Sequence, residues 1–551
     1  MVHLVKKKKK GKVYLYLQET GRVNGKSKRL WQIYLGPEHR FKEHSQIITV
    51  PEVETETIEF GLIAALLLTA EKLGVVNIIN KFVKKRNQGL SVGEHILFAA
   101  INRCVEPVSK TQLKEWFDST ILQKVYPNLG SAIDSRSYWV HFRYFEEDIF
   151  EFIGEKLAQG AINKFNVSFD DLLFDPSNFF TYINPKKPNQ TLPRHGHSKE
   201  GRSTLNLVNF SLFCALDGGI PFLHLIYPGN VHDTKHFKDA LSKLKKRLNS
   251  IDIPSAAITL TFDKGNLSEE AFEFIDGEGF DYIASIRPST QKDLLLISSK
   301  VFSLDDLPNG KHIGVKEVKR EVYGKNRRII AIYNPKQAKW LKENFEVKID
   351  DKIDAIKEFF KNRLNNKRWS REDKIRAKCE KIVGSKKFKN VIKVEFTGEE
   401  GNLNLSITKN KVAFEEYVLS LGKSFLMTSR TDLEPLEVAW AYRQQYIIEN
   451  AFKLLKNPNY LSIRPMFHRI DSSVRGHIFV CFIGLLLLSL LVRDLVKKNI
   501  PLSIPKAIKT LKKIKITKLT IPGRQKSVNK VDKMDEQAKI IYKALNLEQF
   551  V

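Results

Sequence analysis

The spacing of apolar positions changes several times along the chain, and the first change separates a β segment from a helical one. Residues 13–18 and 29–35 alternate or run apolar on either side of Asn24-Gly25, a pair typical of a tight turn. From about residue 60 to 164, apolar positions recur at helical spacing, with Gly and Pro between the runs. The pattern predicts an N-terminal β-hairpin followed by several helices.

Past the helical region, strand and helix patterns alternate. Apolar runs predict a strand that ends near Asp175, a hairpin about Asp217, a strand that ends at Asp263 and another over residues 280–287. One helical pattern begins near Asp233, and a second follows Asp263. Three strands, helix, strand, helix, strand is the element order of an RNase H-like α/β core. Two of these strands end in an acidic residue, and such strand ends are where α/β sheets bind ligands and metals.

Residues of about 301–424 interrupt this pattern. Short strand patterns at residues 327–334 and 390–396 accompany a helical pattern at residues 350–364. The stretch Lys361–Lys393 holds 13 Lys and Arg against three Asp and Glu, which makes it a candidate phosphate-binding surface. We therefore expect a β-rich, basic unit outside the α/β sheet.

The most apolar stretch of the chain is Ile478–Val492. Its 15 residues are fewer than the roughly 18 to 20 that a membrane-spanning helix needs. We predict a buried core helix here, with a short membrane helix as the alternative.

The stretch Ala441–Lys456 has apolar residues at helical spacing and neither Gly nor Pro, which predicts one helix. Tyr442, Glu449 and Lys456 lie seven residues apart and would therefore share one face. The carboxylate can hold a hard metal ion, while the hydroxyl and the ammonium group can hold phosphate oxygens. The alternative is an amphipathic helix with a solvated charged face.

The amino-acid composition indicates the class of molecule that the protein binds. The chain has 91 Lys and Arg against 62 Asp and Glu, a formal charge of +29, which indicates a polyanion such as nucleic acid. Residues 1–50 alone carry 12 Lys and Arg against three acids. A basic protein of membrane surfaces is the rival class. The four cysteines form no CxxC pair, which argues against disulfide and thiolate-zinc sites and fits a reducing cytoplasm.

Three carboxylates are candidates for one catalytic site. We hypothesise that Asp175, Asp263 and Glu449 converge, because clustered carboxylates repel one another unless cations lie between them. Two Mg²⁺ or Mn²⁺ ions are the usual solution in enzymes that cut or join phosphodiesters, and oxygen ligands select these ions over zinc. Each acid alone is weak evidence for a metal site, since Asp175 could belong to a turn and Asp263 could cap a helix. The neighbouring acids that could be mistaken for ligands are Asp170, Asp171, Asp217, Asp233 and Asp281, and we interpret Asp233 as a helix cap.

Several segments, in their order along the chain, resemble DDE transposases of prokaryotic insertion sequences, in the group with a YREK signature. The segments LLFDPSNFF, RHGHSKEGR, GIPFLHLIYPGNVHD and TFDKGNLSE resemble the region of the two aspartates. YRQQYIIENAFKLLK and IRPMFHRIDSSVRGHIFVCFIGLLL resemble the glutamate helix and its successor. KVYLYLQETGRVNGKSKRLWQIYLG and GLSVGEHILFAAINRCVEPVSK extend the resemblance over nearly the whole chain.

The resemblance implies roles for particular residues. Asp175, Asp263 and Glu449 would hold the metal ions, and Tyr442 and Lys456 would contact DNA phosphates near the cut. The signature arginine falls on Gln445, which cannot make a charged phosphate contact. The residues we predict to bind DNA, from the signature, its helix and the RHGHSKEGR segment, are Tyr442, Lys456, Arg443, Lys453, Arg194, His197, Lys199 and Arg202.

The sequence thus predicts an α/β protein with an RNase H-like catalytic core. The expected segments are a basic N-terminal β-hairpin arm (1–55), a helical, DNA-binding region (56–165), the first part of the core (166–300), a β-rich insertion (301–424), the second part of the core with the glutamate helix (425–500) and a basic C-terminal region (501–551). The expected function is Mg²⁺-dependent cleavage at insertion-sequence ends and strand transfer into target DNA, by a homodimer in the cytoplasm, associated with the nucleoid and without a membrane partner. A plain RNase H-like nuclease and an inactive, domesticated DNA-binding remnant are the alternatives.

Overall fold

The computed structural model describes residues 2–23, 26–42, 54–83, 89–127, 129, 132–142, 147–188, 190–466, 468–520 and 527–551. The chain forms two compact units, a coarser division than the six predicted segments. The first unit comprises Met1–Ile58, Lys515–Lys533 and Val551, and the second comprises Glu59–Ile514 and Met534–Phe550.

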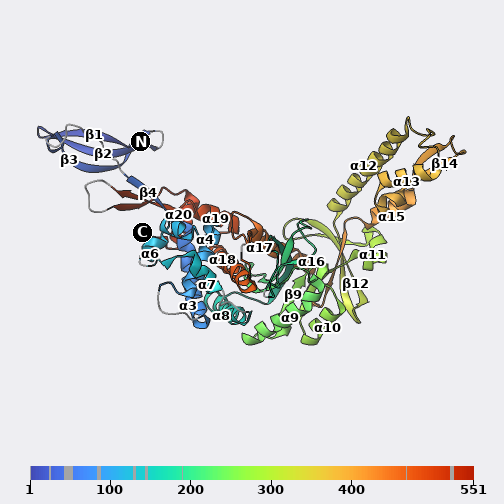
Figure 1. Cartoon of the computed structure of the whole chain (residues 1–551), viewed down its shortest axis with the longest axis horizontal. Helices are drawn as coiled ribbons and strands as arrows, with labels where there is room; N and C mark the ends of the chain where they lie inside the picture. Colours follow the sequence, from blue (N-terminus) through green and yellow to red (C-terminus); the bar gives the residue numbers. More distant parts are fainter. Residues whose placement is uncertain are drawn as a thin grey trace. The chain divides into compact units, whose positions relative to one another are not determined.

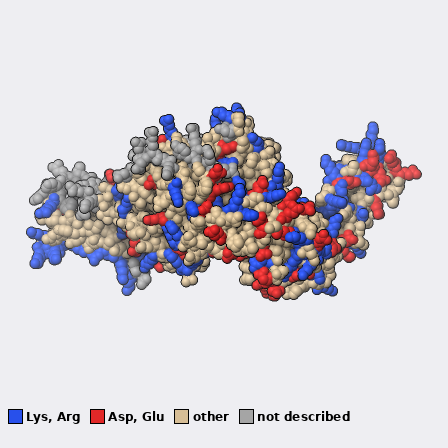
Figure 2. Space-filling view, turned by 90° about the horizontal axis from the view of Figure 1, so that it is seen from below, with Lys and Arg blue, Asp and Glu red and all other residues tan. Residues whose placement is uncertain are grey.

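The first unit contains two three-stranded sheets. One has the order β1-β2-β3 with all strands antiparallel, and the other has the order β18-β17-β4. The elements of this unit are β1 (Val2–Lys9), β2 (Lys12–Val23), β3 (Lys26–Pro37), α1 (Glu38–Lys42), β4 (Glu54–Glu59), β17 (Lys515–Thr520) and β18 (Val528–Val531). Figure 2 shows Lys and Arg side chains along the N-terminal sheet, with few Asp and Glu among them.

The predicted hairpin corresponds to β2 and β3. Its turn residues, Asn24 and Gly25, lie outside the described residues, and the pairs Arg22 with Ser27 and Val23 with Lys26 flank them. The lysine-rich N-terminus, which the pattern did not mark as a strand, pairs with β2 as strand β1. Two strands of the C-terminal region also join this unit.

A buried helix organises the N-terminal part of the second unit. Helix α18 (Asp471–Lys497) contains the most apolar stretch and packs against α2, α4, α7 and strand β8, so it joins the helical region to the core sheet (Figure 1). It is longer than the predicted 15-residue stretch and passes a length and hydropathy test for a membrane span, but 89% of its most apolar window is buried inside the protein. The other helices of this region are α2 (Gly61–Leu73), α3 (Val75–Phe82), α4 (Val92–Val105), α5 (Leu113–Asp118), α6 (Leu122–Val125), α7 (Ser135–Phe142), α8 (Glu147–Phe165), α19 (Ile504–Leu511) and α20 (Glu536–Ala544).

The core sheet has the predicted element order. Its strands lie in the order β8-β7-β5-β9-β10, with β5, β9 and β10 parallel and β7 antiparallel to both of its neighbours. The elements are β5 (Asp171–Thr181), β6 (Arg194–His195), β7 (Asn206–Ala215), β8 (Pro221–Pro228), α9 (Asp233–Ser250), β9 (Thr259–Phe262), α10 (Glu269–Glu278) and β10 (Asp281–Ile286). The sequence prediction of an RNase H-like α/β core is confirmed by this arrangement.

The insertion differs from its prediction. Residues 303–333 and 423–428 do not form a separate β-rich unit but continue the core sheet beyond β10, in the order β10-β16-β13-β12-β11. The helical and strand elements from β10 to the active site are α11 (Lys292–Leu296), β11 (Ser303–Asp306), β12 (His312–Val322), β13 (Lys325–Tyr333), α12 (Pro335–Phe360), α13 (Glu372–Val383), α14 (Lys386–Val391), β14 (Ile392–Thr397), β15 (Asn404–Lys409), α15 (Lys411–Ser420), β16 (Lys423–Thr428), α16 (Pro435–Arg443) and α17 (Tyr446–Lys456).

Only the residues between β13 and β16 leave the sheet, and they are mainly helical. They have a hydrophobic core of their own, which includes Phe345, Ile349, Ile356 and Val391. Hydrophobic periodicity marks a strand but does not say which sheet it joins, and this is why the extension of the core sheet was missed.

Candidate active site

Asp175 lies where strand β5 loses one of its two neighbours. The parallel pairing of β5 with β9 ends at the pair Phe174 with Phe262, whereas its antiparallel pairing with β7 continues to Thr181. Strand β5 therefore does not end near Asp175, as the sequence suggested, and Asp175-Pro176 is not a turn. Proline is tolerated at a strand position where no neighbour needs its missing N–H, and the end of β9 provides such a position.

Two side chains bind the backbone carbonyls on both sides of Asp175. Gln445 Nε2 donates a hydrogen bond to the Phe174 carbonyl at 3.0 Å, and Lys199 Nζ donates to the Pro176 carbonyl at 2.6 Å. Buried carbonyls cost free energy when they lack a donor, so these bonds replace the partner that β9 no longer supplies. Gln445, at the signature arginine position, therefore holds the strand that carries Asp175.

Asp263 is held by two hydroxyl groups. Ser285 Oγ donates a hydrogen bond to Asp263 Oδ1, and the Tyr442 hydroxyl donates to the same oxygen at 3.2 Å. The backbone N–H of Lys264 in turn bonds to Ser285 Oγ at 2.9 Å. Asp263 does not cap the following helix, because Ser268 is the N-cap of α10.

Sequence reasoning missed Ser285. The parallel pairing of β10 with β9 matches Ala284 with Phe262, and this register places the next residue of β10 beside Asp263. The signal was available in principle, since a polar residue after an apolar run in the neighbouring parallel strand faces the same sheet edge.

Glu449 lies in the first turn of helix α17, and its side chain is exposed. The predicted single helix over residues 441–456 is wrong, because α16 ends at Arg443 and α17 begins at Tyr446. At the break, the N–H groups of Gln444 and Gln445 bond to carbonyls three residues earlier, as in a tighter 3₁₀ turn. The side-chain bond from Gln445 to β5 is a tertiary contact that fixes this break.

Electrostatic repulsion shows that the predicted carboxylates share one region. Burial is the largest cause that raises the pKa of Asp175 to about 7; the charges of Asp263, Asp233 and Glu449 contribute in the same direction, while Lys199 opposes them. Like charges raise a carboxyl pKa in this way only at short range. Asp263 and Glu449 therefore lie near enough to Asp175 for their charges to act on it, and Tyr442 and Gln445, which precede Glu449, contact Asp263 and the Phe174 carbonyl.

Asp233 joins the same cluster and is not the helix cap that the sequence suggested. The N-cap of α9 is His232, and the Asp233 carboxylate lies 2.9 Å from Lys199 Nζ and 3.2 Å from the Tyr227 hydroxyl. Lys199 thus bridges the carbonyl of Pro176 and the Asp233 carboxylate.

The donor set of this cluster fits a hard divalent ion, because every ligand it offers is a carboxylate oxygen. Within the described part of the chain, no three His, Cys, Asp or Glu side chains lie close enough together to hold one ion. The residues therefore form an acidic cluster of the right chemistry rather than a closed metal site.

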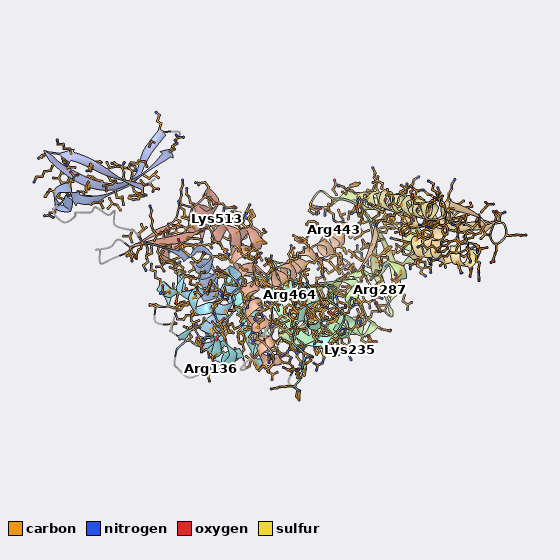
Figure 3. All side chains as sticks on the ribbon, turned by 45° about the horizontal axis from the view of Figure 1, so that its top comes forward. Arg136, Lys235, Arg287, Arg443, Arg464 and Lys513 are labelled. Atoms are coloured by element: carbon orange, nitrogen blue, oxygen red, sulfur yellow. The ribbon has the colours of Figure 1, made fainter. Side chains whose placement is uncertain are left out.

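Two cations at the end of α17 are paired with one glutamate. Lys456 Nζ lies 3.2 Å from Glu200 Oε1, and Arg464 Nη1 lies 2.7 Å from Glu200 Oε2. Both cations also lie over aromatic rings, Lys456 over Phe179 and Arg464 over Phe180. Figure 3 shows Arg464 where the core sheet meets the C-terminal helices. Sequence reasoning predicted Lys456 but missed Arg464 and its carboxylate partner.

The other predicted DNA contacts are placed as follows. Arg443 lies at the end of α16 (Figure 3), and Lys453 is exposed on α17 with its Nζ 3.1 Å from Asn450 Oδ1. Arg194 donates to the carbonyls of Gln190 and Pro193, and the Arg202 guanidinium lies over the Phe180 ring. His197 accepts a backbone hydrogen bond from Asn178. No contact in the structure tests their role toward DNA.

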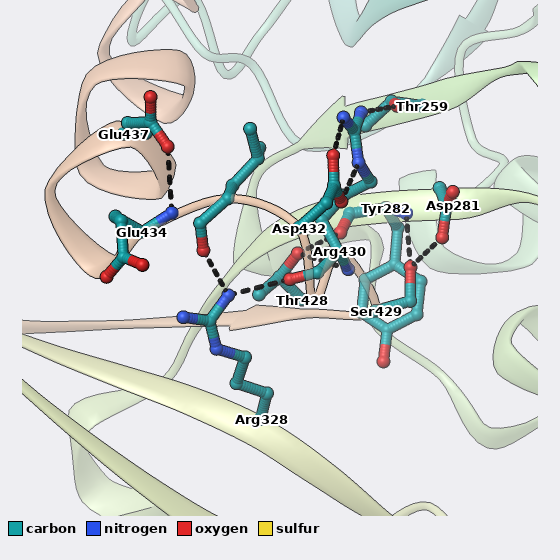
Figure 4. A network of polar contacts seen from close by, with 11 residues as sticks. Thr259, Asp281, Tyr282, Arg328, Thr428, Ser429, Arg430, Asp432, Glu434 and Glu437 are labelled. Carbon is teal, nitrogen blue, oxygen red and sulfur yellow. Dashed lines mark hydrogen bonds and ion pairs between the residues drawn. The ribbon is translucent and has the colours of Figure 1, made fainter.

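A polar network at the opposite ends of the core strands fixes the connection from β16 to α16. Arg328 donates to the carbonyls of Arg430 and Leu433 at 2.7 and 2.6 Å, and Arg430 bonds to Thr259 at 2.7 Å (Figure 4). Ser429 Oγ donates to Asp281 Oδ1 at 2.6 Å. The connection leads directly into α16, so this network positions Tyr442 from a distance.

The remaining acids have structural surroundings of their own. Asp170, Asp171 and Asp281 lie beside Arg430 at this opposite edge. Asp217 is bonded to Arg493, with Nε to Oδ1 at 2.6 Å. Neither group adds to the acidic cluster at Asp175.

Comparison with known proteins assigns the family. The family model described as transposase DDE domain matches residues 186–487, which is more than half of the chain. The chain belongs to the DDE transposase family. The match contains Asp263 and Glu449 of this DDE transposase and begins after Asp175. No curated protein matches the chain.

Among solved structures, this transposase is similar to the piggyBac transposase in a synaptic complex with hairpin DNA, determined by cryo-EM. The sequence identity is 8%, the match covers 84% of this chain and 82% of that chain, and the TM-score is 0.38. A likeness at this level supports no argument about function.

Proposed function

We propose that this DDE transposase is a metal-dependent strand-transfer enzyme of the YREK-signature group of insertion sequences. The observation that carries the proposal is the electrostatic coupling of Asp175 to Asp263 and Glu449, whose charges add to the effect of burial in raising the pKa of Asp175. Clustered carboxylates repel one another unless cations lie between them, and Lys199 supplies a positive charge at the border of this cluster.

The proposed roles follow from the contacts. Asp175, Asp263 and Glu449 would hold two Mg²⁺ or Mn²⁺ ions, which when bound activate an attacking oxygen and neutralise charge on the phosphate. Ser285 and Tyr442 orient Asp263, and Gln445 and Lys199 fix the strand around Asp175. Lys456 and Arg464 would bind phosphate oxygens with charged donors.

The proposed reaction has two in-line displacements. Water attacks the phosphodiester at the end of the element and releases a 3′-hydroxyl, and this hydroxyl then attacks target DNA without a covalent protein intermediate. We further propose that two copies of the chain act together on two element ends, in the cytoplasm at the nucleoid.

A cleavage and joining assay tests the proposal. The substrate is DNA that carries the inverted repeats flanking the reading frame, mixed with a plasmid target and Mg²⁺. We expect both cut ends and joined products. Cut ends without joined products would identify the protein as a plain nuclease. DNA binding without cutting would identify it as an inactive remnant.

A separate prediction concerns Glu200, which neutralises Lys456 and Arg464 in the absence of DNA. Replacing Glu200 with Gln frees both cations, so we expect the affinity for duplex DNA to rise about three- to tenfold at low salt. Filter binding over a salt series measures this change.

The matched control is Glu278→Gln, because Glu278 pairs with Lys245 at 2.6 Å on the helical side of the core with similar exposure. This control should leave DNA affinity unchanged. If Glu200→Gln binds DNA no better than the wild type, Lys456 and Arg464 do not contact phosphates.

A further inference from the structure

A second basic site lies in the helical region, in a cavity of about 350 Å³. Arg103 lines it from the last turn of α4, and Ser109, Lys110 and Thr111 line it from the segment that follows. Ser135 at the start of α7 and His468 in the connection after α17 complete the wall. The described lining residues, which also include His477, therefore gather two cations, three hydroxyl groups and two imidazoles, but no carboxylate.

Neither cation forms an ion pair with a carboxylate among the residues that the structure describes. Lys110 Nζ lies 3.1 Å from His468 Nε2 and 5.1 Å from the centre of the Phe142 ring. The guanidinium of Arg103 makes no hydrogen bond or ion pair with any residue the structure describes. Two buried arginines elsewhere in the fold are instead paired with an aspartate.

Two arginines illustrate the difference. Arg327 bonds to both oxygens of Asp276, and Arg493 bonds to Asp217 and to two backbone carbonyls. A buried cation without such partners is costly, since neither water nor an anion replaces its lost hydration. Arg103 and Lys110, which are partly buried, thus differ from these two arginines.

The same excess of positive charge shifts the pKa values of the neighbouring titratable groups. Burial, with a contribution from the charge of Arg103, lowers the pKa of Lys110 to about 7. Burial also lowers the pKa of His468 to about 2 and that of His477 well below its usual value, and in both cases Lys110 and Arg103 add to the effect. None of the described residues bonds to the Nδ1 atom of His477, a residue of the cavity wall that is 1% exposed.

We propose that this cavity is a binding site for a phosphate group, held by Lys110 and Arg103 and by the hydroxyl groups of Ser109, Thr111 and Ser135. Cations and hydroxyls that converge without a carboxylate match the tetrahedral oxygens of a phosphate. The hydroxyls are close enough to act together, since Ser109 Oγ and Thr111 Oγ1 lie 2.7 Å apart.

The place of the cavity in the fold indicates a source for the phosphate. Pro465 lines the cavity, and the adjacent Arg464 reaches the active site, where it binds Glu200. One short connection after α17 therefore borders both sites. Resting on the proposed function, we take a backbone phosphate of DNA as the ligand, and free phosphate offers the same chemistry.

The variant Lys110→Met tests the site, with Lys114→Met as its control. Lys114 is an exposed lysine of the next helix, paired with Asp118 at 2.5 Å. Thermal unfolding of the full chain is followed with and without inorganic phosphate, at constant ionic strength and with EDTA. DNA affinity is measured over a salt series under the same metal-free conditions, so neither readout needs catalysis.

We expect phosphate to raise the unfolding temperature of the wild type and of Lys114→Met but not of Lys110→Met. The slope of log K against log salt should fall by about one for Lys110→Met if DNA supplies the phosphate. If Lys110→Met loses the rise in unfolding temperature with phosphate but keeps the wild-type slope of log K against log salt, the ligand of the site is free phosphate rather than DNA.

The folded state of Lys110→Met should be at least as stable as that of the wild type without phosphate, because the change removes an uncompensated cation. Arg103→Met, which removes the other cation, is the second variant and should lose the phosphate response in the same way. If phosphate stabilises both variants as much as the wild type and the DNA slope does not change, the proposal is wrong.

Discussion

Replacing Glu449 with Gln is expected to leave a folded protein that binds DNA but cuts and joins it several orders of magnitude more slowly. Glutamine keeps the size and helix propensity of glutamate but cannot supply the charge that holds a metal ion. The exposed position of Glu449 in the first turn of α17 means that its loss should change stability by less than about 0.5 kcal/mol. DNA binding should persist, because the cations at Lys456 and Arg464 are untouched and one negative charge is gone.

The control for this prediction is Asp281→Asn. Asp281 begins strand β10 at the opposite edge of the sheet, where it accepts a hydrogen bond from Ser429. Cleavage and strand transfer in Mg²⁺, measured beside circular dichroism and DNA binding, should be close to normal for this variant. Normal strand transfer by Glu449→Gln, with a folded but inactive Asp281→Asn, would mean that the catalytic carboxylate has been misassigned.

Replacing Asp175 with Asn is expected to give an inactive variant that is more stable than the metal-free wild type. In the metal-free protein the pKa of Asp175 is raised to about 7 from an ordinary value of 3.8, so the folded state binds a proton more tightly than the unfolded state. Between about pH 4 and pH 7 the wild type therefore loses stability as the pH rises. Asp175→Asn carries no charge and avoids this loss, so above pH 7 its free energy of unfolding should exceed that of the wild type by up to about 4 kcal/mol.

Chemical unfolding in EDTA across this pH range measures the difference. Adding Mg²⁺ at pH 8 should stabilise the wild type, since a bound cation relieves the repulsion, and should stabilise Asp175→Asn much less. Asp217→Asn should change the free energy of unfolding in the opposite direction, because hydrogen bonds and the charge of Arg493 hold the pKa of Asp217 below its usual value. That variant should be less stable than the wild type at neutral pH. If Asp217→Asn instead gains as much stability as Asp175→Asn, the gain at Asp175 does not come from relief of its raised pKa.

Local pattern was sufficient for the order of the core elements. Alternating strand and helix patterns predicted the order from β5 to β10, because apolar periodicity reflects which face of each element is buried. The same pattern placed Asp263 directly after its strand, but it wrongly ended β5 near Asp175. The net charge of +29 also predicted a polyanionic partner without any structure.

Contacts between distant segments decided the rest. The break between α16 and α17 exists because Gln445 bonds to a carbonyl of β5, and a helical pattern contains no sign of that partner. Strand β5 runs past Asp175 because β7 continues beside it after β9 has ended. In the same way, residues 303–333 join the core sheet because β13 pairs with β16, about 90 residues later in the chain.

What the sequence determined by itself was therefore the order and type of most elements, the charge and the residue types of the site. What only the tertiary structure decided was which side chains contact one another: Ser285 and Tyr442 contact Asp263, Glu200 contacts Lys456 and Arg464, and none of the described acids pairs with Arg103 or Lys110. The physical reason is that helix and strand patterns arise from neighbours in the chain, whereas hydrogen bonds and ion pairs join groups that only the packed fold brings within a few ångströms.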